Sequence, residues 1–387
     1  MDDTYGATID RLPELIAGLP ERERALAEQL FQVVATAGTL EPPPEMAPWL
    51  ERTFGSVEVT RRQRIIRVMN RWTFEGATFN PLRSRRPGAS DTRAAPADPP
   101  ELRERIDRAL GDDFCQLETR TPADAFGRVH GRHISTASNV AKADGWHGVA
   151  IFDQHDPLAL DAALVDDLFA VALEWARLAQ RDDPAARHLF LFWNCLWRAG
   201  ASLIHGHAQM TLSHTMAHAR VEGLRAAAQR YHAATGGDYF TDLATVHEAL
   251  GLRTTPTEAV AGLASLTPIK DREVMLLAFG ARTDDLARLA TPLWETLRVA
   301  MGALGVRAFN VAAYGPPLGA DPDRAGWANF PLVARFVDRG APLASASDIA
   351  ALELYGSSVI ASDPFDLART LRAQAGGQGL AGEESRP

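Results

Sequence analysis

The sequence is short of lysine, cysteine and long apolar runs, and each shortage excludes a class of protein. Only Lys142 and Lys270 are lysines among 40 basic residues. Two cysteines, Cys115 and Cys195, cannot build the disulfide framework of a small secreted domain, so we expect a reducing compartment. The most apolar run, residues 188–197, is about half the length of a membrane-spanning helix. The first 30 residues also lack an apolar signal core. We therefore expect a soluble, cytoplasmic protein without membrane partners.

Positive charge is also in deficit, and histidine is unevenly spread. The 387 residues carry a formal net charge of -9, which argues against a nucleic-acid-binding surface but allows a local arginine cluster to hold a small phosphate. All 11 histidines lie between His130 and His247, so any histidine chemistry belongs to the middle of the chain. The shares of apolar residues (46%) and charged residues (23%) are those of an ordinary globular protein, and the length suits two compact units.

Alternating strand and helix signals indicate an α+β protein in two halves. Residues 8–37 are apolar at helical spacing and predict two helices, after which Pro42, Pro43 and Pro44 begin a linker. The expected parts are an N-terminal helical extension with its linker (1–60), a first unit (61–235), a second unit (236–372) and a disordered tail (373–387). The expected strands are 148–153, 187–194, 205–213, 273–278 and 308–314, and the expected helices 158–180, 217–234 and 284–304.

The stretch from Asn194 to Gln209 is the most informative part of the sequence. Alternate side chains share one face of a strand, so His205, His207 and Gln209 would project together, about 6–7 Å apart in succession. Three polar side chains in a row on one face do not belong to an apolar core. They indicate either a solvated cleft or a metal site.

This stretch resembles the histidine triad superfamily, in particular its galactose-1-phosphate uridylyltransferase branch. That branch carries an Asn, then Gly-x-Ser, then His-x-His-x-Gln. The positions in register here are Asn194, Gly200, Ser202, His205, His207 and Gln209. Gly206 departs from the proline that is usual in these enzymes. Hydrolytic members have a third histidine where this chain has Gln209, which favours transfer over hydrolysis. The resemblance implies two half-domains, each an antiparallel sheet with packed helices.

The residues themselves suit nucleotidyl transfer. An unperturbed imidazole is mostly neutral at pH 7 and is a good nucleophile at phosphorus, so His207 can form a nucleotidyl-histidine. The amide of Gln209 can donate to a non-bridging oxygen without supplying a proton for hydrolysis. Gly200 and Ser202 suit a departing or entering phosphate. By resemblance, a backbone carbonyl near His205 orients the ring of His207.

Two further segments supply candidate contacts by resemblance. The sequence Asn80-Pro81-Leu82 precedes a basic cluster that would approach substrate phosphates, although a solvated loop explains it as well; its members are Arg83, Arg85 and Arg86. Residues 138–142 lie where relatives place a nucleotide-contacting loop, which makes Asn139 and Lys142 candidate substrate contacts.

A zinc site is the remaining question that the resemblance raises. Several uridylyltransferases bind zinc through a Cys-x-x-Cys pair, a histidine at a strand end and the first histidine of the triad. Here one cysteine is missing, and Cys115, Glu118, His155 and His205 are the candidate ligands, because carboxylate can replace thiolate. A weakened or lost site is the alternative.

The predicted activity is transfer of a nucleoside monophosphate through His207, from a nucleoside diphosphate compound to a phosphate-bearing acceptor. A sugar phosphate as acceptor gives a uridylyltransferase-like enzyme. Inorganic phosphate gives a phosphorylase of a nucleotide sugar or a dinucleoside polyphosphate. Two rivals stay open: a metal-dependent hydrolase that uses His205 and His207 as a zinc pair, and a non-catalytic nucleotide sensor. By resemblance we also expect a homodimer.

Overall fold

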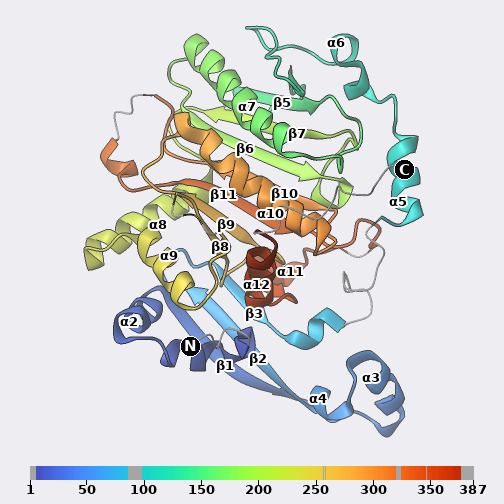
Figure 1. Cartoon of the computed structure of the whole chain (residues 1–387), viewed down its shortest axis with the longest axis vertical. Helices are drawn as coiled ribbons and strands as arrows, with labels where there is room; N and C mark the ends of the chain where they lie inside the picture. The colour runs from blue at the N-terminus through green and yellow to red at the C-terminus, as the bar shows by residue number, and fades with distance from the viewer. Residues whose placement is uncertain are drawn as a thin grey trace, which may run out of the picture.

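One continuous antiparallel sheet forms the centre of the molecule (Figure 1). The computed structural model describes residues 6–85, 98–255, 257, 259–319, 324–345 and 347–375. In spatial order the strands are β4 (Ile134–Ser138), β5 (Trp146–Phe152), β7 (His207–Ser213), β6 (His188–Cys195), β10 (Phe309–Tyr314), β11 (Leu332–Asp338), β9 (Val274–Ala278) and β8 (Ala261–Ala264). Because β6 pairs with β10, the two predicted half-sheets join edge to edge. The predicted α+β class is confirmed, with the halves merged into one sheet.

Long helices cover one face of this sheet, in front of the strands in Figure 1. They are α7 (Ala162–Asp182), α10 (Ala290–Gly302) and α12 (Pro364–Ala375). Asp161 begins α7 by accepting the N–H of Leu164 at 2.8 Å, which explains why the helix starts later than predicted. The buried side of α7 includes Trp175, whose indole lies against Gly148 of β5. A Cβ at Gly148 would lie 2.7 Å from that ring, so the close packing of helix on strand requires glycine there.

A short segment before β4 covers part of the opposite face. It contains α5 (Pro100–Arg108), the 3-10 helix η5 (Asp113–Gln116) and α6 (Leu117–Arg120). Phe114 and Leu117 of this segment pack against Val149 and Ile151 of β5. The side chains of Val149 and Ile151 alternate with those of Gly148 and Ala150, so this packing belongs to the face opposite α7. That face also receives the candidate catalytic side chains.

A second, four-stranded sheet contains β1 of the N-terminal extension, two strands that follow it and one strand from near the C-terminus. Its order is β1 (Phe31–Thr39), β2 (Arg62–Asn70), β3 (Gly76–Phe79) and β12 (Ser358–Ile360). Strand β12 comes from the C-terminal part of the chain and pairs parallel with β3, which ties the extension to the second half. The remaining helices are α1 (Leu12–Ala17), α2 (Glu21–Leu30), α3 (Ala47–Phe54), α4 (Val57–Arg61), α8 (Ala219–Thr235), α9 (Tyr239–Ala249) and α11 (Ala351–Tyr355). Figure 1 shows α3 and α4 beyond the far end of the β1–β2 pair, away from the main body.

The prediction of helix through residue 37 is wrong beyond Leu30. Residues Phe31–Thr39 form β1, which pairs antiparallel with β2 so that Val33 lies opposite Val68. Helical spacing of apolar residues correctly indicates α1 and α2, but Val33 and Val34 are β-branched and favour a strand once a partner is available. That partner, β2, lies about thirty residues further along the chain, beyond the reach of a local pattern.

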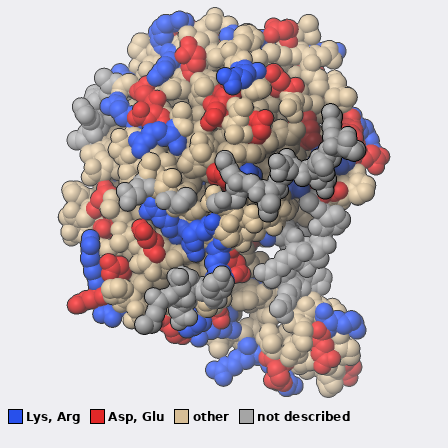
Figure 2. All heavy atoms as spheres, in the orientation of Figure 1, with Lys and Arg blue, Asp and Glu red and all other residues tan. Residues whose placement is uncertain are grey.

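The other predicted elements are found with shifts of their ends, and the predicted helix 284–304 is divided into the 3-10 helix η7 (Thr283–Leu289) and α10. Helix α12 extends to Ala375, so the first residues of the predicted tail are helical, and the rest of the tail lies outside the described residues. The boundaries predicted at residues 60, 235 and 372 stay predictions. No helix in the described part of the chain is long and apolar enough to cross a membrane. On the face shown in Figure 2, positive and negative side chains are interspersed.

A buried histidine in α9 makes the stability of the fold depend on pH. His247 is 2% exposed, and its Nδ1–H donates to the carbonyl of Leu243 at 2.8 Å. Burial lowers the pKa of His247 from 6.5 to about 4. The unfolded chain therefore takes up a proton as pH falls through 6.5, whereas the folded chain does so only near pH 4. We expect this group to lower the free energy of unfolding by up to about 3 kcal/mol across that window.

The measurement is urea denaturation of the wild type and of His247→Asn between pH 7.5 and pH 4. Asparagine does not titrate and retains an N–H for the Leu243 carbonyl. We expect the stability difference between the two proteins to move in favour of the variant by about 3 kcal/mol as the pH falls. A difference that is independent of pH would contradict the assignment of a buried neutral imidazole.

Candidate active site and metal group

His207 is the first residue of β7 and is held in one orientation by the backbone. Its Nδ1 lies 2.7 Å from the carbonyl oxygen of His205, and since a carbonyl only accepts, Nδ1 carries the proton. The lone pair of Nε2 is therefore available. Burial lowers the pKa of His207, which keeps the ring neutral at pH 7. The ring of Phe114 packs edge-on against it at a centroid distance of 5.1 Å. His207 is thus a buried, neutral and oriented imidazole, with the carbonyl contact that the resemblance implies.

Gln209 lies two residues along β7 and shares the face of His207, as strand alternation predicts. Its Oε1 lies 2.9 Å from Nε2 of His147 and 3.3 Å from Nδ2 of Asn139. Asn139, a predicted nucleotide contact, therefore contacts Gln209. His147, which lies on β5 opposite Thr211, is not among the residues predicted from the sequence. Only the pairing register of β5 and β7 brings it to Gln209.

The loop between β6 and β7 is anchored to the second half of the chain. Asn194 lies opposite Asn310 of β10, and the amide of Asn310 donates both to Oδ1 of Asn194 (2.7 Å) and to the carbonyl of Ala199 (2.8 Å). Gly200 has φ of 98°, a left-handed conformation that favours glycine. Ser202, which follows it, is exposed. The second half therefore fixes the loop in which the resemblance expects phosphate contacts.

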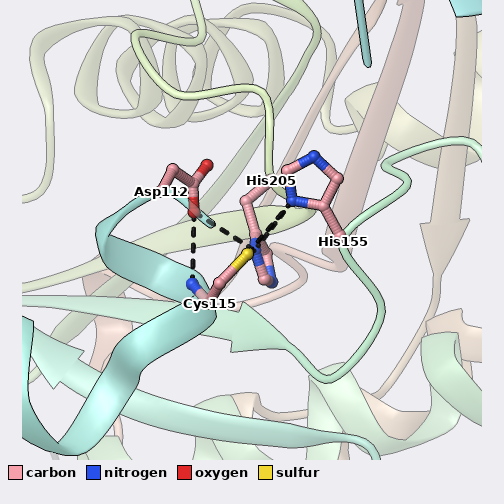
Figure 3. Close-up of side chains that lie close together, drawn as sticks. All are labelled: Asp112, Cys115, His155 and His205. Carbon is pink, nitrogen blue, oxygen red and sulfur yellow. Dashed lines mark hydrogen bonds and ion pairs between the residues drawn. The ribbon is translucent and has the colours of Figure 1, made fainter. Parts of the chain in front are cut away.

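Four side chains converge into a candidate metal group beside His207 (Figure 3). They are Asp112, Cys115, His155 and His205. Sγ of Cys115 lies 3.3 Å from Nδ1 of both histidines, and these two nitrogens are 3.4 Å apart. Bonds of 2.0–2.3 Å to a tetrahedral zinc ion place neighbouring ligand atoms roughly 3.3–3.8 Å apart. The spacing of the donor atoms therefore suits zinc.

Hydrogen bonds to the outer nitrogens orient both histidines toward the group. Nε2 of His155 lies 3.0 Å from the carbonyl of Ile106, and Nε2 of His205 lies 2.7 Å from the carbonyl of Phe152. Both Nε2 atoms are therefore protonated donors, and both Nδ1 lone pairs face Cys115. Oδ1 of Asp112 lies 3.4 Å from Nδ1 of His205 and also accepts the N–H groups of Phe114 and Cys115. The residues present fit a divalent zinc ion.

The carboxylate of this group belongs to Asp112, not to the predicted Glu118. Glu118 lies in α6 with its side chain 70% exposed, and it is ion-paired with Arg128 at 3.4 Å. Asp112 caps η5, the turn that carries Cys115, and this cap points the carboxylate at His205. The carboxylate that lies beside Cys115 therefore precedes it by three residues, whereas the predicted carboxylate follows it by three. The signal was present as Asp112-x-x-Cys115.

Of the predicted basic contacts, the structure describes the side chains of Arg83 and Lys142. Arg83 belongs to the 3-10 helix η4 (Pro81–Arg85) at the end of β3, in the four-stranded sheet, whereas His207 starts β7 of the central sheet. The side chain of Arg85 and all of Arg86 lie outside the described residues. The ammonium of Lys142 donates to Ser138 at 2.6 Å and lies 3.6 Å from the carboxylate of Asp124, which is 2% exposed. The structure therefore gives Lys142 internal partners.

Comparison with known proteins is informative at the level of structure. No protein-family model matches the sequence, and no curated protein does. An ADP-glucose phosphorylase from Arabidopsis thaliana, solved with bound ADP-glucose, superposes with a TM-score of 0.58 at 15% identity, over 79% of this chain and 97% of that one. A GalT-like protein from the same plant gives 0.55 at 16% identity, over 68% and 92%. A uridylyltransferase gives 0.54 at 16% identity, over 67% and 90%.

The TM-scores of 0.54 to 0.58 establish a shared fold, whereas identities of 15–16% do not establish a shared reaction. The chain covers 97% of the phosphorylase and 90% of the uridylyltransferase. The chain therefore shares the fold of an ADP-glucose phosphorylase and of a uridylyltransferase.

Proposed function

We propose that the protein is a nucleotidyltransferase that forms a covalent nucleotidyl-histidine on His207. The observation that carries the proposal is the buried, neutral ring of His207, with Nδ1 bonded to the carbonyl of His205 and Nε2 unprotonated. Gln209 on the same face supports it, because an amide donor beside the nucleophile suits a phosphate oxygen. The shared fold with an ADP-glucose phosphorylase and a uridylyltransferase is consistent with this reaction.

The reaction has two balanced steps. In the first, the Nε2 lone pair of His207 attacks the α-phosphorus, a P–N bond forms, and the P–O bond to the leaving phosphate breaks. The ring becomes cationic, and its Nδ1–H donates more strongly to the His205 carbonyl. In the second, an oxygen of the acceptor phosphate attacks the same phosphorus and the P–N bond breaks, which restores neutral His207. The amide of Gln209 donates to a non-bridging oxygen in both steps.

The acceptor is a sugar phosphate or inorganic phosphate. We favour inorganic phosphate, and hence a phosphorylase, because the ADP-glucose phosphorylase superposes over more of this chain than the uridylyltransferase does. The hydrolase rival requires His205 and His207 to bind one zinc ion as a pair. His205 belongs to the group of Asp112, Cys115 and His155, which does not include His207, and this disfavours that rival. The homodimer and the cytoplasmic location stay predictions from the sequence.

Intact mass spectrometry of the denatured protein at mildly basic pH tests the proposal. The protein is incubated briefly with UDP-, ADP- and GDP-sugars, dinucleoside polyphosphates and adenylyl sulfate. We expect a mass increase of one nucleoside monophosphate with one class of donor. Subsequent addition of inorganic phosphate or sugar 1-phosphate should remove it, and the more effective of the two identifies the acceptor. Absence of an adduct with every donor, alongside reversible nucleotide binding, would indicate a sensor or a direct hydrolase.

The metal group is proposed to bind zinc in a structural role. Such an ion would fix η5, whose Phe114 packs on His207, and His205, whose carbonyl orients His207. Zinc would supply folding free energy and a rigid turn, and no chemical step passes through it.

We expect about one zinc ion per chain and a strong effect of Asp112→Ala on its affinity. The variant should bind zinc at least about 100-fold more weakly in competition with a chelator, since it loses one of four ligands. Glu118→Ala is the matched control: it removes a carboxylate from the same segment but outside the group, and it should bind zinc as the wild type does. Equal loss in both variants, or unchanged affinity in Asp112→Ala, would contradict the assigned ligand set.

A further inference from the structure

We propose that His147, together with Asn139, is a positioning residue that holds the Gln209 side chain with its N–H group toward the substrate phosphate. The inference rests on the proposed function and adds to it the cause of the Gln209 orientation. An amide side chain has two nearly equivalent orientations, one presenting a donor to a given point and the other an acceptor. Only the first of these stabilises an anionic phosphate oxygen. The groups that select this orientation of the Gln209 amide therefore contribute to catalysis.

The tautomer of His147 follows from its backbone partner. Nδ1 of His147 receives the N–H of Ala143 at 3.0 Å, and since a backbone N–H only donates, Nδ1 is unprotonated. In a neutral ring the proton then resides on Nε2. His147 is 4% exposed, and burial lowers its pKa, which favours the neutral ring. The Nε2–H group therefore donates across 2.9 Å to Oε1 of Gln209.

The amide of Asn139 is oriented in the same way. Its Oδ1 accepts the N–H of Ala141 at 3.0 Å, so the opposite end of the amide is the donor, Nδ2. That donor lies 3.3 Å from Oε1 of Gln209. Oε1 thus receives two donors, which are 3.4 Å apart because they share one acceptor.

These two donors make the alternative orientation of Gln209 unfavourable. Rotation of its amide by half a turn would place its own N–H group against Nε2–H of His147 and Nδ2 of Asn139, three donors without an acceptor. The observed orientation leaves Nε2 of Gln209 on the side away from both, where a substrate oxygen can accept from it. The positions of both donors are fixed by the chain: His147 by β5, and Asn139 by the turn that follows β4.

A double-mutant cycle measures whether His147 acts through Gln209. The four proteins are the wild type, His147→Leu, Gln209→Ala and the double variant, and the readout is the rate at which His207 gains a nucleotide from its best donor. Loss of one preorganised donor costs about 100- to 1000-fold, and a freely rotating amide retains part of the effect. We expect His147→Leu alone to slow the reaction about 10- to 100-fold. In the Gln209→Ala background it should have less than about a 3-fold effect, since the group it positions is gone.

A conservative variant separates positioning from packing. Glutamine places a side-chain N–H near the position of the imidazole Nε2, so His147→Gln should recover most of the rate, whereas His147→Leu, of similar volume, should not. Thermal unfolding of all variants reports whether the fold is intact. Equal slowing by His147→Leu in both Gln209 backgrounds would overturn the inference, as would an unchanged rate in His147→Leu.

Failure of the proposed function gives a different result. If the wild type forms no adduct with any donor, the covalent mechanism is contradicted. The double-mutant cycle can then be measured with the dissociation constant for a nucleoside monophosphate as its readout. Coupling between His147 and Gln209 in that constant would still support the positioning role. Additive effects of the two substitutions would overturn it.

Discussion

Replacement of His207 by alanine is expected to abolish formation of the nucleotidyl adduct. Without the Nε2 lone pair no P–N bond can form, and we expect the overall transfer rate to fall by at least about 10⁴-fold. The substitution leaves the backbone of β7 and the other candidate substrate contacts in place, so the variant should still bind the nucleotide reversibly. Intact mass, initial rate and nucleotide dissociation constant are the three measurements.

The control for this experiment lies on the same segment of chain. His214 follows β7, is about half exposed and pairs with Asp183 at 2.6 Å, so His214→Ala removes an imidazole without touching the site. It should retain the adduct and the rate of the wild type. An adduct that persists in His207→Ala would assign the nucleophile to another group. Loss of the adduct in His214→Ala but not in His207→Ala would have the same consequence.

Replacement of Arg335 by methionine is expected to destabilise the fold by about 3–5 kcal/mol. Arg335 lies on β11 and contacts two carboxylates, Glu273 beside β9 and Glu75 in the turn between β2 and β3. The side chain of Glu273 is 0% exposed, and burial raises its pKa. Removal of the guanidinium leaves Glu273 buried without this counter-ion, whereas Glu75 is partly exposed. It also removes an ion pair that connects the four-stranded sheet to the central sheet.

Urea denaturation of Arg335→Met and of a surface control decides this prediction. Arg298 pairs with Glu295 on α10, both side chains are about one third exposed, and Arg298→Met should cost less than about 1 kcal/mol. In Arg335→Met, Glu273 must be protonated in the folded state. Because its folded pKa lies above its unfolded pKa, the variant should lose further stability as the pH rises from 5 to 8. A loss as small as that of Arg298→Met, or one independent of pH, would contradict the buried-pair account.

The central sheet was predictable because its signals are local. Strands β5, β6, β7, β9 and β10 and helices α7, α8 and α10 all lie within a few residues of their predicted ranges. The apolar residues of each element repeat either at the period of a helix or at the period of a strand, and Gly or Pro interrupts the pattern between elements. Strand β1 was mistaken for helix because its pairing with β2 is decided by a partner that lies outside any local window.

In the candidate site, too, some residues were predictable from local spacing and others depend on tertiary pairing. His207 and Gln209 were identified from their spacing, and strand alternation alone places them on one face. His147 was not identified, because its approach to Gln209 depends on the register between β5 and β7. Glu118 was predicted because it lies three residues after Cys115, and Asp112 was not among the predicted ligands. The cap of η5 decides which carboxylate lies beside Cys115.

The sequence by itself determined the fold class and the placement of His207 and Gln209, the proposed nucleophile and its neighbour, on one strand. These depend on hydrophobic period and on the separation of residues along one strand, both of which are properties of neighbouring residues. The tertiary structure decided the carboxylate of the metal group, the orientation of Gln209 and the anchoring of Asn194 by Asn310. Each of these joins segments that are far apart in the chain. Their meeting depends on strand register and on burial, which only the folded chain defines.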